Sequence, residues 1–549
     1  MSTLEQIANY LVLALSAVFV DDPLFVIAGL VPITITVLMV GGGFVTGIIV
    51  GATPGLAGPM AMAVALPILL SIFGLSADAL LPVVGFLIGI MKGATVGGAV
   101  PAILFNTPGT PDALLTTFDG FPMAKKGQAQ KALRTAHFSS ALGDSFSDLV
   151  LITTAPFLAI LVERFLDFPE KTSLIILSMA FIAAIVGKSV GKGLISASLG
   201  LLAAYIASGE DFVPRLTMGA DVLKNGFPLV TAVLGVLILG EVFKAMEDLV
   251  RGGPEPKTEK NLNHTQGNRF GWADVRRLFP YMRNSALIGT AIGALPGVGS
   301  TLAATLGYAS GKRRHDKNHP PGQRFGDGVP EGIAATEAAN SAVSGANLIP
   351  VLSLGIPGNA AAVFLILAFE SIGGFNPGPG VFRLNPAVAS GSINPELVMV
   401  LGIFVMMMLA NGFNWTIGGL FMRVVGVMGA IPKHILLPVI LILTLTGIYV
   451  QSTNITDLYF AIGFGFLGYF MRKIDMSVLP FVIAFILGRN LEFTARRAFE
   501  ATGADVYFLF SSPISIAFLV MAVAVIVFAL RRKPAPGEPS AKSEMSDFD

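Results

Sequence analysis

The sequence predicts an all-α integral membrane protein, because its composition and the grouping of its apolar residues exclude a soluble globular domain. Only 13% of the 549 residues are charged, whereas soluble domains carry roughly 25%. The hydrophobic fraction is 53% and the mean hydropathy is +0.74. Uncharged runs such as Leu229–Gly240, Leu397–Met408 and Ser515–Leu530 each have, or extend to, a length that can cross the hydrocarbon core.

The charge balance and the rare residue types exclude several classes of function. The net charge of +1 leaves no basic surplus for a nucleic-acid partner. With 0 cysteines, disulfides, zinc-thiolate sites and iron–sulfur clusters are excluded. The five histidines form no HExxH motif, so we expect no metal site and no cofactor. The N-terminus lacks the basic region of a cleavable signal peptide, since the first basic residue is Lys92.

Three basic stretches, Lys125–Arg134, Arg251–Arg283 and Lys312–Arg324, are expected in the cytoplasm by the positive-inside rule. The acidic stretch Gly209–Asp221 then lies outside, and four crossings fit between residues 135 and 250. Towards the C-terminus we expect crossings near Met476–Leu487 and within residues 507–530, which leave three arginines between them outside, against that rule. The polar tail from residue 531 is expected to be disordered.

An internal repeat divides the chain. Gly51-Ala-Thr-Pro54-Gly55-Leu-Ala-Gly58 is echoed by Gly293-Ala-Leu-Pro296-Gly297-Val-Gly299-Ser300. Downstream, Pro101 precedes Pro108-Gly109 by seven residues, and Pro350 precedes Pro357-Gly358 by the same seven. Each half therefore contains two Pro-Gly breaks within apolar sequence.

Such breaks have a specific physical meaning. Proline stops or kinks a helix, and glycine lets a ligand approach the backbone. Backbone groups freed inside a bilayer normally line a buried or watery cavity, and the N-terminus of the restarting helix attracts anions. Proline and glycine are also common in membrane helices, but paired breaks at matching positions favour a transporter binding site.

The charges indicate that the two halves have opposite orientations. Residues 71–81, between the first-half breaks, contain no basic residue, whereas Lys312–Arg324 separates the second-half breaks. We predict about twelve membrane segments, counting re-entrant hairpins, in two inverted-topology repeats with broken helices. Residues 1–250 would form the first repeat half with scaffold helices, 251–283 a cytoplasmic linker, 284–530 the second half with its scaffold helices, and 531–549 the tail. Asn284–Ser310 would form a re-entrant hairpin broken at Pro296-Gly297.

Polar and backbone groups at the breaks are the candidate site. We expect N–H groups at and after Gly55, Gly109, Gly297 and Gly358 to hold substrate carboxylates. The candidate substrate-binding residues are Thr53, Pro54, Gly55, Asn106, Thr107, Pro108, Gly109, Thr110, Pro296, Gly297, Gly299, Ser300, Thr301, Pro357, Gly358 and Asn359. The candidate cation-coupling residues are Glu337, Asn340 and Ser344. Lys92 either neutralises an anion or extends to the interface.

The two enzyme motifs that the sequence matches lie in the wrong structural context, so we expect no catalytic residues. Residues 187–191 match both the end of a P-loop and a G-x-S-x-G elbow, but they lie in a short turn between apolar segments. Either motif requires a strand-to-helix turn in a soluble sheet.

Several motifs resemble the large membrane subunit of tripartite tricarboxylate transporters, the TctA family. They are Asn106-Thr-Pro-Gly-Thr-Pro111, Phe118-Asp-Gly-Phe-Pro-Met-Ala-Lys-Lys-Gly127, Glu331-Gly-Ile-Ala-Ala-Thr-Glu-Ala-Ala-Asn340, Leu354-Gly-Ile-Pro-Gly358 and Lys473-Ile-Asp-Met476. The resemblance spans roughly residues 45 to 530. It differs at Met91-Lys92, where aromatic residues are expected, and in a longer N-terminal segment.

The resemblance implies a multi-pass permease in a bacterial inner membrane that imports citrate or other small organic carboxylates by secondary transport. It implies symport with sodium or protons, a small membrane subunit, and a periplasmic solute-binding protein. A passive anion channel or a non-catalytic membrane scaffold subunit is the alternative.

Overall fold

The computed structural model describes residues 3–27, 31–53, 56–186, 189–207, 215–251, 270–297, 299–373, 375, 377–384, 393–420, 422 and 433–531. These residues are predominantly helical, which confirms the predicted class. They contain one small sheet, in which β1 (Pro23–Ile27) pairs antiparallel with β2 (Val31–Thr34). Six of the described helices are long and apolar enough to cross a membrane, in keeping with a multi-pass membrane protein. The tail from residue 532 lies outside the described residues.

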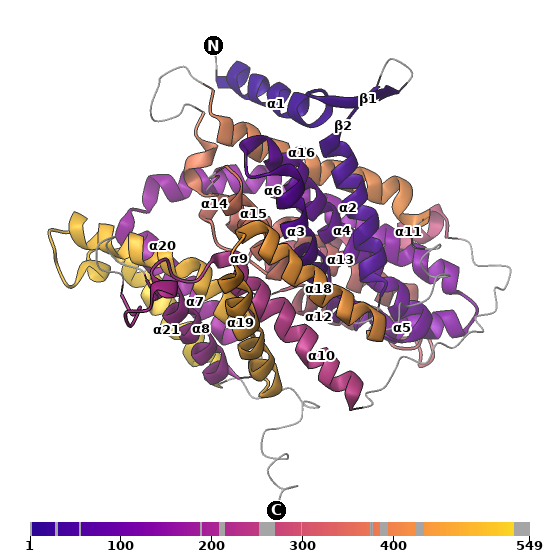
Figure 1. The fold of residues 1–549 in the computed structure, drawn as a ribbon. Coiled ribbons are helices and arrows are strands. Elements are labelled where there is room, and N and C mark those ends of the chain that lie inside the picture. The colour runs from indigo at the N-terminus through magenta and orange to yellow at the C-terminus, as the bar shows by residue number, and fades with distance from the viewer. Residues whose placement is uncertain are drawn as a thin grey trace, which may run out of the picture.

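The described residues of the first half are mostly helical (Figure 1). Its helices are α1 (Thr3–Phe19), α2 (Ile35–Gly51), α3 (Gly58–Phe73), α4 (Leu80–Phe105), α5 (Thr116–Lys125), α6 (Ala129–Phe165), α7 (Phe168–Ile185), α8 (Val190–Tyr205), α9 (Leu229–Leu234) and α10 (Gly240–Val250). Shorter turns are η1 (Ala77–Ala79), η2 (Pro111–Ala113) and η3 (Asp221–Leu223), and the π-helical η4 (Gly235–Leu239) joins α9 to α10. Four helical segments thus lie between residues 129 and 250, and three of them are long and apolar enough to cross a membrane.

The second half begins with a helical hairpin. Its helices are α11 (Trp272–Gly293), α12 (Gly299–His315), α13 (Pro330–Ala346), α14 (Leu348–Leu354), α15 (Ala360–Ser371), α16 (Pro395–Phe413), α18 (Lys433–Ser452), α19 (Ile455–Lys473), α20 (Leu479–Ala501) and α21 (Pro513–Arg531). Shorter turns are η5 (Asp316–Asn318), η6 (Pro379–Phe382), η7 (Asn414–Gly418) and η8 (Phe508–Phe510). α11 and α12 pack together around the predicted break at Pro296-Gly297, and α11 begins within the expected linker.

Two long helices approach each other through glycine. A Cβ atom built on Gly93 of α4 would lie 2.1 Å from the Phe44 carbonyl oxygen of α2, and one on Gly47 would lie 2.5 Å from the Ile90 oxygen. Glycines recur every fourth residue on both helices, at positions 43, 47 and 51 of α2 and at 89, 93 and 97 of α4. Small residues let membrane helices pack backbone to backbone, and this contact fixes α4 at the centre of the molecule.

Two helices of the second half also pack closely through glycines. Gly289 and Gly293 of α11 lie 242 positions after Gly47 and Gly51 of α2, the offset that separates the first breaks. A Cβ on Gly289 would lie 2.2 Å from the Ala339 oxygen of α13. The pairs α2–α4 and α11–α13 are therefore built from repeat-equivalent residues.

The remaining helices surround this centre (Figure 1). α7 and α8 pack against α20 and α21, and α10 packs against α19. α20 is one continuous helix that contains Arg489, Arg496 and Arg497, so these arginines lie on its second half. α1 and the β1–β2 hairpin lie together at one end of the molecule, next to α16.

Candidate functional site

In both halves the helix before the second break ends with the same backbone turn. α4 ends at Asn106, which has a left-handed conformation (φ 52°, ψ 29°), and α14 ends at Gly355 (φ 70°, ψ 22°). The Pro101 carbonyl accepts the Asn106 N–H, and the Pro350 carbonyl accepts the Gly355 N–H. Each second-half residue lies 249 positions after its partner, so the repeated sequence produces a repeated structure.

Within each half the two breaks contact each other. The Gly297 N–H donates to the Gly358 carbonyl over 2.7 Å. In the first half the Gly109 N–H donates to the Gly98 carbonyl over 3.3 Å, and a Cβ on Gly109 would lie 2.0 Å from the Gly51 oxygen. Two of the amides expected to hold substrate, at Gly109 and Gly297, are therefore bonded within the protein in this arrangement.

A cavity of about 80 Å³ lies where the breaks of both halves meet. Its lining includes five of the predicted site residues, namely Thr110, Ser300, Asn340, Ser344 and Asn359. It also includes Gly58, Met91 and Pro111 of the segments quoted above, and Asn347, a polar residue close to a second-half break. The remaining lining residues were not singled out by the sequence, namely Ala57, Pro59, Ala94, Thr95, Asp112, Val343 and Ala361. Asp112 carries the only charged side chain in this lining.

The cavity is lined by equivalent positions of the two halves. An offset of 249 relates five pairs of lining residues, which are Met91 and Asn340, Ala94 and Val343, Thr95 and Ser344, Thr110 and Asn359, and Asp112 and Ala361. The first-break offset of 242 relates Gly58 and Ser300. Residues of both copies thus face the same space, as they would around an approximate twofold axis.

Helix N-termini converge on this cavity. The lining includes the first residues of α3, α12 and α15, and residues of the short turn η2. The N-cap Asn359 accepts the Ala362 N–H over 2.9 Å, whereas α3 has no side-chain cap. Uncapped N–H groups and the helix dipoles contribute a positive potential that suits an anion, and the negative charge of Asp112 acts against it.

Two buried amides also face the cavity. Asn340 and Asn347 are each 1% exposed. Within the described part of the chain, neither the oxygen nor the nitrogen of either amide has a hydrogen-bond partner. Since buried polar groups are normally bonded, these four atoms are available to a polar ligand.

The other predicted substrate-binding residues lie on the breaks without lining the cavity. Thr301 donates to Asp112 over 2.5 Å and joins the two halves. The hydroxyls of Thr53 and Thr107 are bonded to nearby carbonyls, and Asn106 is exposed. Pro54 and Gly55 lie outside the described residues. The remaining predicted residues are also absent from the lining, namely Pro108, Gly109, Pro296, Gly297, Gly299, Pro357 and Gly358.

Glu337 is completely buried one turn before Asn340 on α13. Its carboxylate accepts the hydroxyls of Thr116 and Ser140, the latter over 3.1 Å. Both donors are neutral. Carboxylate and hydroxyl oxygens are the groups that a hard cation or a proton prefers.

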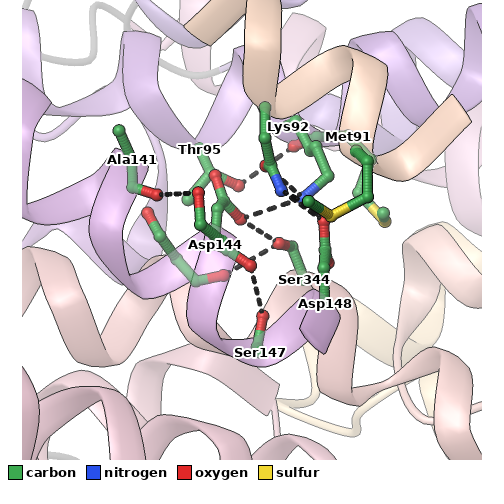
Figure 2. A network of polar contacts seen from close by, with 12 residues as sticks. Met91, Lys92, Thr95, Ala141, Asp144, Ser147, Asp148 and Ser344 are labelled. Carbon is green, nitrogen blue, oxygen red and sulfur yellow. Dashed lines mark hydrogen bonds and ion pairs between the residues drawn. The ribbon is translucent and has the colours of Figure 1, made fainter. Parts of the chain in front are cut away.

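Lys92 lies in a buried charge network between α4, α6 and α16 (Figure 2). Its ammonium nitrogen is 2.8 Å from Asp148 Oδ2, 3.4 Å from Asp144 Oδ1 and 3.0 Å from Asn411 Oδ1. The three charged side chains are all 0% exposed. Asn411 also donates to Asp148 over 2.7 Å, and Ser344 of α13 donates to Asp144. We call Lys92, Asp144, Asp148, Asn411 and Ser344 the buried charge network.

Neither expectation for Lys92 is correct, because its charge is taken up by two aspartates rather than by solvent or by an open anion site. Sequence reasoning missed both partners. A signal existed, since Asp144 and Asp148 are four residues apart on one face of a helix with the composition of a membrane span.

Asp119, within one of the motifs quoted above, holds the segment before α13. Its Oδ1 accepts the N–H groups of Gly326, Gly328 and Val329 over 2.9–3.0 Å, and its Oδ2 accepts the Tyr308 hydroxyl. Burial raises the pKa of this carboxyl above its ordinary value, while the N–H donors act in the opposite direction. Asp119 is a positioning residue that links α5 to the start of α13.

The sequence matches a family model over residues 37–483. That family is described as the tripartite tricarboxylate transporter TctA family. A relative from Agrobacterium vitis, an uncharacterised 52.8 kDa protein in the TAR-I ttuC' 3' region, is 31% identical and covers 89% of this chain and 92% of its own length.

A second Agrobacterium vitis protein, from the TAR-II ttuC' 3' region, is 32% identical over 44% of this chain and 93% of its own length. Among solved structures, the manganese transporter of Eremococcus coleocola is 14% identical, with 90% of this chain and 94% of that chain covered. Its TM-score of 0.12 is too low to indicate a shared fold.

Proposed function

Because the chain belongs to the tripartite tricarboxylate transporter TctA family, we propose that it is the permease subunit of a binding-protein-dependent secondary transporter. It imports tricarboxylates or related organic carboxylates, such as citrate, across a bacterial inner membrane. A small membrane subunit assembles with it, and a periplasmic solute-binding protein delivers the anion. A sodium or proton gradient drives the import, as symport.

One observation carries this proposal, namely a cavity lined by repeat-equivalent residues at which helix N-termini converge. The substrate carboxylates bind there, near Thr110, Ser300, Asn340 and Asn359. The breaks at residues 53–55, 106–110, 296–301 and 357–359 supply backbone N–H groups when the site opens. A cavity of about 80 Å³ is smaller than the roughly 300–1,000 Å³ of typical small-molecule pockets. Carboxylate entry therefore requires the lining to move apart.

The candidate cation-coupling residues lie on α13, next to the substrate cavity. Glu337, Asn340 and Ser344 recur on neighbouring turns of this helix, and two of the three line the cavity. Glu337 has only neutral hydroxyl donors among the bonds of the described residues, so its negative charge is available to a cation.

The repeat halves have opposite orientations in the membrane. Residues 1–250 and 284–530 form the two halves with their scaffold helices, 251–283 form a cytoplasmic linker, and 531–549 a disordered tail. About twelve segments lie in the membrane, with α11–α12 as a re-entrant hairpin. The repeated order of helix, break, helix, long helix and second break supports this arrangement.

Gradient-driven uptake tests the proposal. Cells that express this chain with its partner subunits and binding protein take up radiolabelled citrate, with a panel of carboxylates as competitors. The expected result is saturable uptake that depends on one of the two gradients, so that it collapses when the driving gradient, sodium or proton, is removed. Uptake that ignores both gradients would identify a passive channel instead. Normal uptake in cells without this chain would overturn the proposal.

A further inference from the structure

We propose that the coupling ion is a proton and that Asp144 of the buried charge network is its acceptor. This inference deepens the proposed function, on which its transport measurement rests. The argument begins with charge balance. Two aspartates face one lysine in a fully buried space, which leaves a net charge of −1. An uncompensated charge out of water is costly, so this cluster has a strong tendency to take up one positive charge.

The unpartnered oxygens show where a proton fits. Asp144 Oδ2 and Asp148 Oδ1 are buried without a hydrogen-bond partner among the described residues. Each of these carboxylates has one bonded oxygen and one free oxygen. A proton on a free oxygen converts the carboxylate to a carboxylic acid and changes the net charge of the three groups from −1 to 0, while Lys92 keeps its own proton.

Asp144 is the acceptor because it is held less tightly than Asp148. The ammonium nitrogen lies 3.4 Å from Asp144 but 2.8 Å from Asp148, and Asp148 also accepts the Asn411 amide over 2.7 Å. The ion pair and the charge-assisted hydrogen bond favour the ionised form of Asp148 more strongly.

A metal ion fits this cluster poorly. Hard cations take six or more oxygen ligands, whereas Lys92 already occupies the position between the two carboxylates. Within the residues that the structure describes, no group of three or more acidic, histidine or cysteine side chains is suited to a metal. Because Lys92 already occupies the space between the two carboxylates, a proton on a free oxygen fills the charge gap with less rearrangement than a sodium ion would need.

Ser344 connects the acceptor to the substrate. Its hydroxyl donates to Asp144, and the same residue lines the cavity. An anion in the cavity repels the negative charge of Asp144 and strengthens its hold on a proton. By thermodynamic reciprocity, protonation of Asp144 then strengthens anion binding by the same factor, which is the requirement for symport.

The other titratable groups around the cluster are few. On α13 Glu337 faces Thr116 and Ser140, and across the cavity Asp112 accepts the Thr301 hydroxyl. On α6 His137 bonds the Asn414 carbonyl. α16 faces the cluster with the neutral Asn411, and the described residues of α2 and α14 carry no ionisable side chain. Glu337 is therefore the main rival acceptor.

Infrared spectroscopy tests the acceptor without a substrate. The purified full chain is titrated with acid, and the C=O stretching band of a protonated carboxylic acid is followed. Asp144→Asn should remove one band that remains in Glu337→Gln and in Glu163→Gln, the latter an exposed control on the same helix. Lys92→Gln should move the midpoint of that band to higher pH, because the ammonium no longer favours the carboxylate. A band lost in Glu337→Gln instead, or an unmoved midpoint in Lys92→Gln, overturns the assignment.

Transport by proteoliposomes tests the coupling. With this chain and its partners reconstituted, an imposed pH gradient should drive citrate uptake, and the ratio of this uptake to citrate counterflow should fall more than tenfold in Asp144→Asn. Uptake driven by sodium but not by the pH gradient overturns the inference while the proposed function stands. Absence of citrate counterflow in the unmodified protein counts against citrate as substrate, and the infrared result still decides the acceptor.

Discussion

The backbone N–H of Gly297 donates a 2.7 Å hydrogen bond to the carbonyl of Gly358. These glycines are 61 positions apart and belong to the two breaks of the second half. The bond fixes one break against the other, so a change at either glycine displaces both. Gly297 also has a φ of 77°, which disfavours any residue with a Cβ.

We expect Gly297→Leu to abolish citrate uptake without loss of membrane insertion. Its Cβ would lie 2.3 Å from Ile182 of α7, and the left-handed conformation costs a further 1–2 kcal/mol or so. Uptake and membrane-fraction abundance are measured together. Gly503→Leu is the control, because Gly503 has a similar φ of 75° but open space around it. Normal uptake by Gly297→Leu would end the assignment of this break to the site.

Two asparagines should separate ligand binding from stability. Asn340→Ala should raise the half-saturating citrate concentration about tenfold, the effect of one lost hydrogen bond to a charged group. The thermal midpoint should stay unchanged, since the Asn340 amide has no partner in the described structure. Asn411→Ala should lower that midpoint, through a loss of about 1–3 kcal/mol in the free energy of unfolding, because Asn411 bonds both Lys92 and Asp148. The opposite pattern would contradict the placement of the cavity.

Replacing a glycine at the contact between α2 and α4 by a residue with a side chain should destabilise the protein. Gly93→Val forces a Cβ to within 2.1 Å of the Phe44 oxygen, and we expect a loss of at least about 3 kcal/mol or failure to assemble. Gly42→Val, on the partner helix α2 but with its nearest neighbour at 3.7 Å, is the control and should cost much less stability. Size-exclusion profiles after heating compare the two. Equal stability would show that the helices are not held by this contact.

Asp119→Ala should destabilise the protein by about 3 kcal/mol, because it leaves the N–H groups of Gly326, Gly328 and Val329 without their acceptor. Asp119→Asn keeps one acceptor oxygen in place and should lose less. Thermal unfolding of both variants in detergent measures the difference. If Asp119→Ala unfolds at the same temperature as the unmodified chain, the segment before α13 is held by other contacts.

The sequence predicted the breaks because proline and glycine act locally. Pro101 and Pro350 recur in register, and the turns at Asn106 and Gly355 have the same geometry. The helical hairpin around Pro296 was also predicted, although α11 begins earlier than expected. Each of these features follows from what a residue does to its own backbone.

Contacts between distant segments could not be predicted in the same way. The partners of Lys92 lie 52 and 56 positions along the chain, and Asn411 lies 319 positions away. The carboxylate pair on α6 indicated a buried site, but not which cation it faces. Nor did the repeat indicate that Gly109 and Gly297 donate their N–H groups within the protein. The β1–β2 hairpin departs from an otherwise helical pattern.

The glycine contact has a mechanical consequence for a carrier. The Phe44 and Ile48 carbonyls lie directly against Gly93 and Gly97, with no side chain between the backbones. Because no side chain at this contact can change its rotamer to make room, the two helices cannot slide past each other. We therefore expect α2 and α4 to move as one rigid body. Any relative motion of helices in a transport cycle is therefore expected at other interfaces, where flexible side chains lie between the backbones.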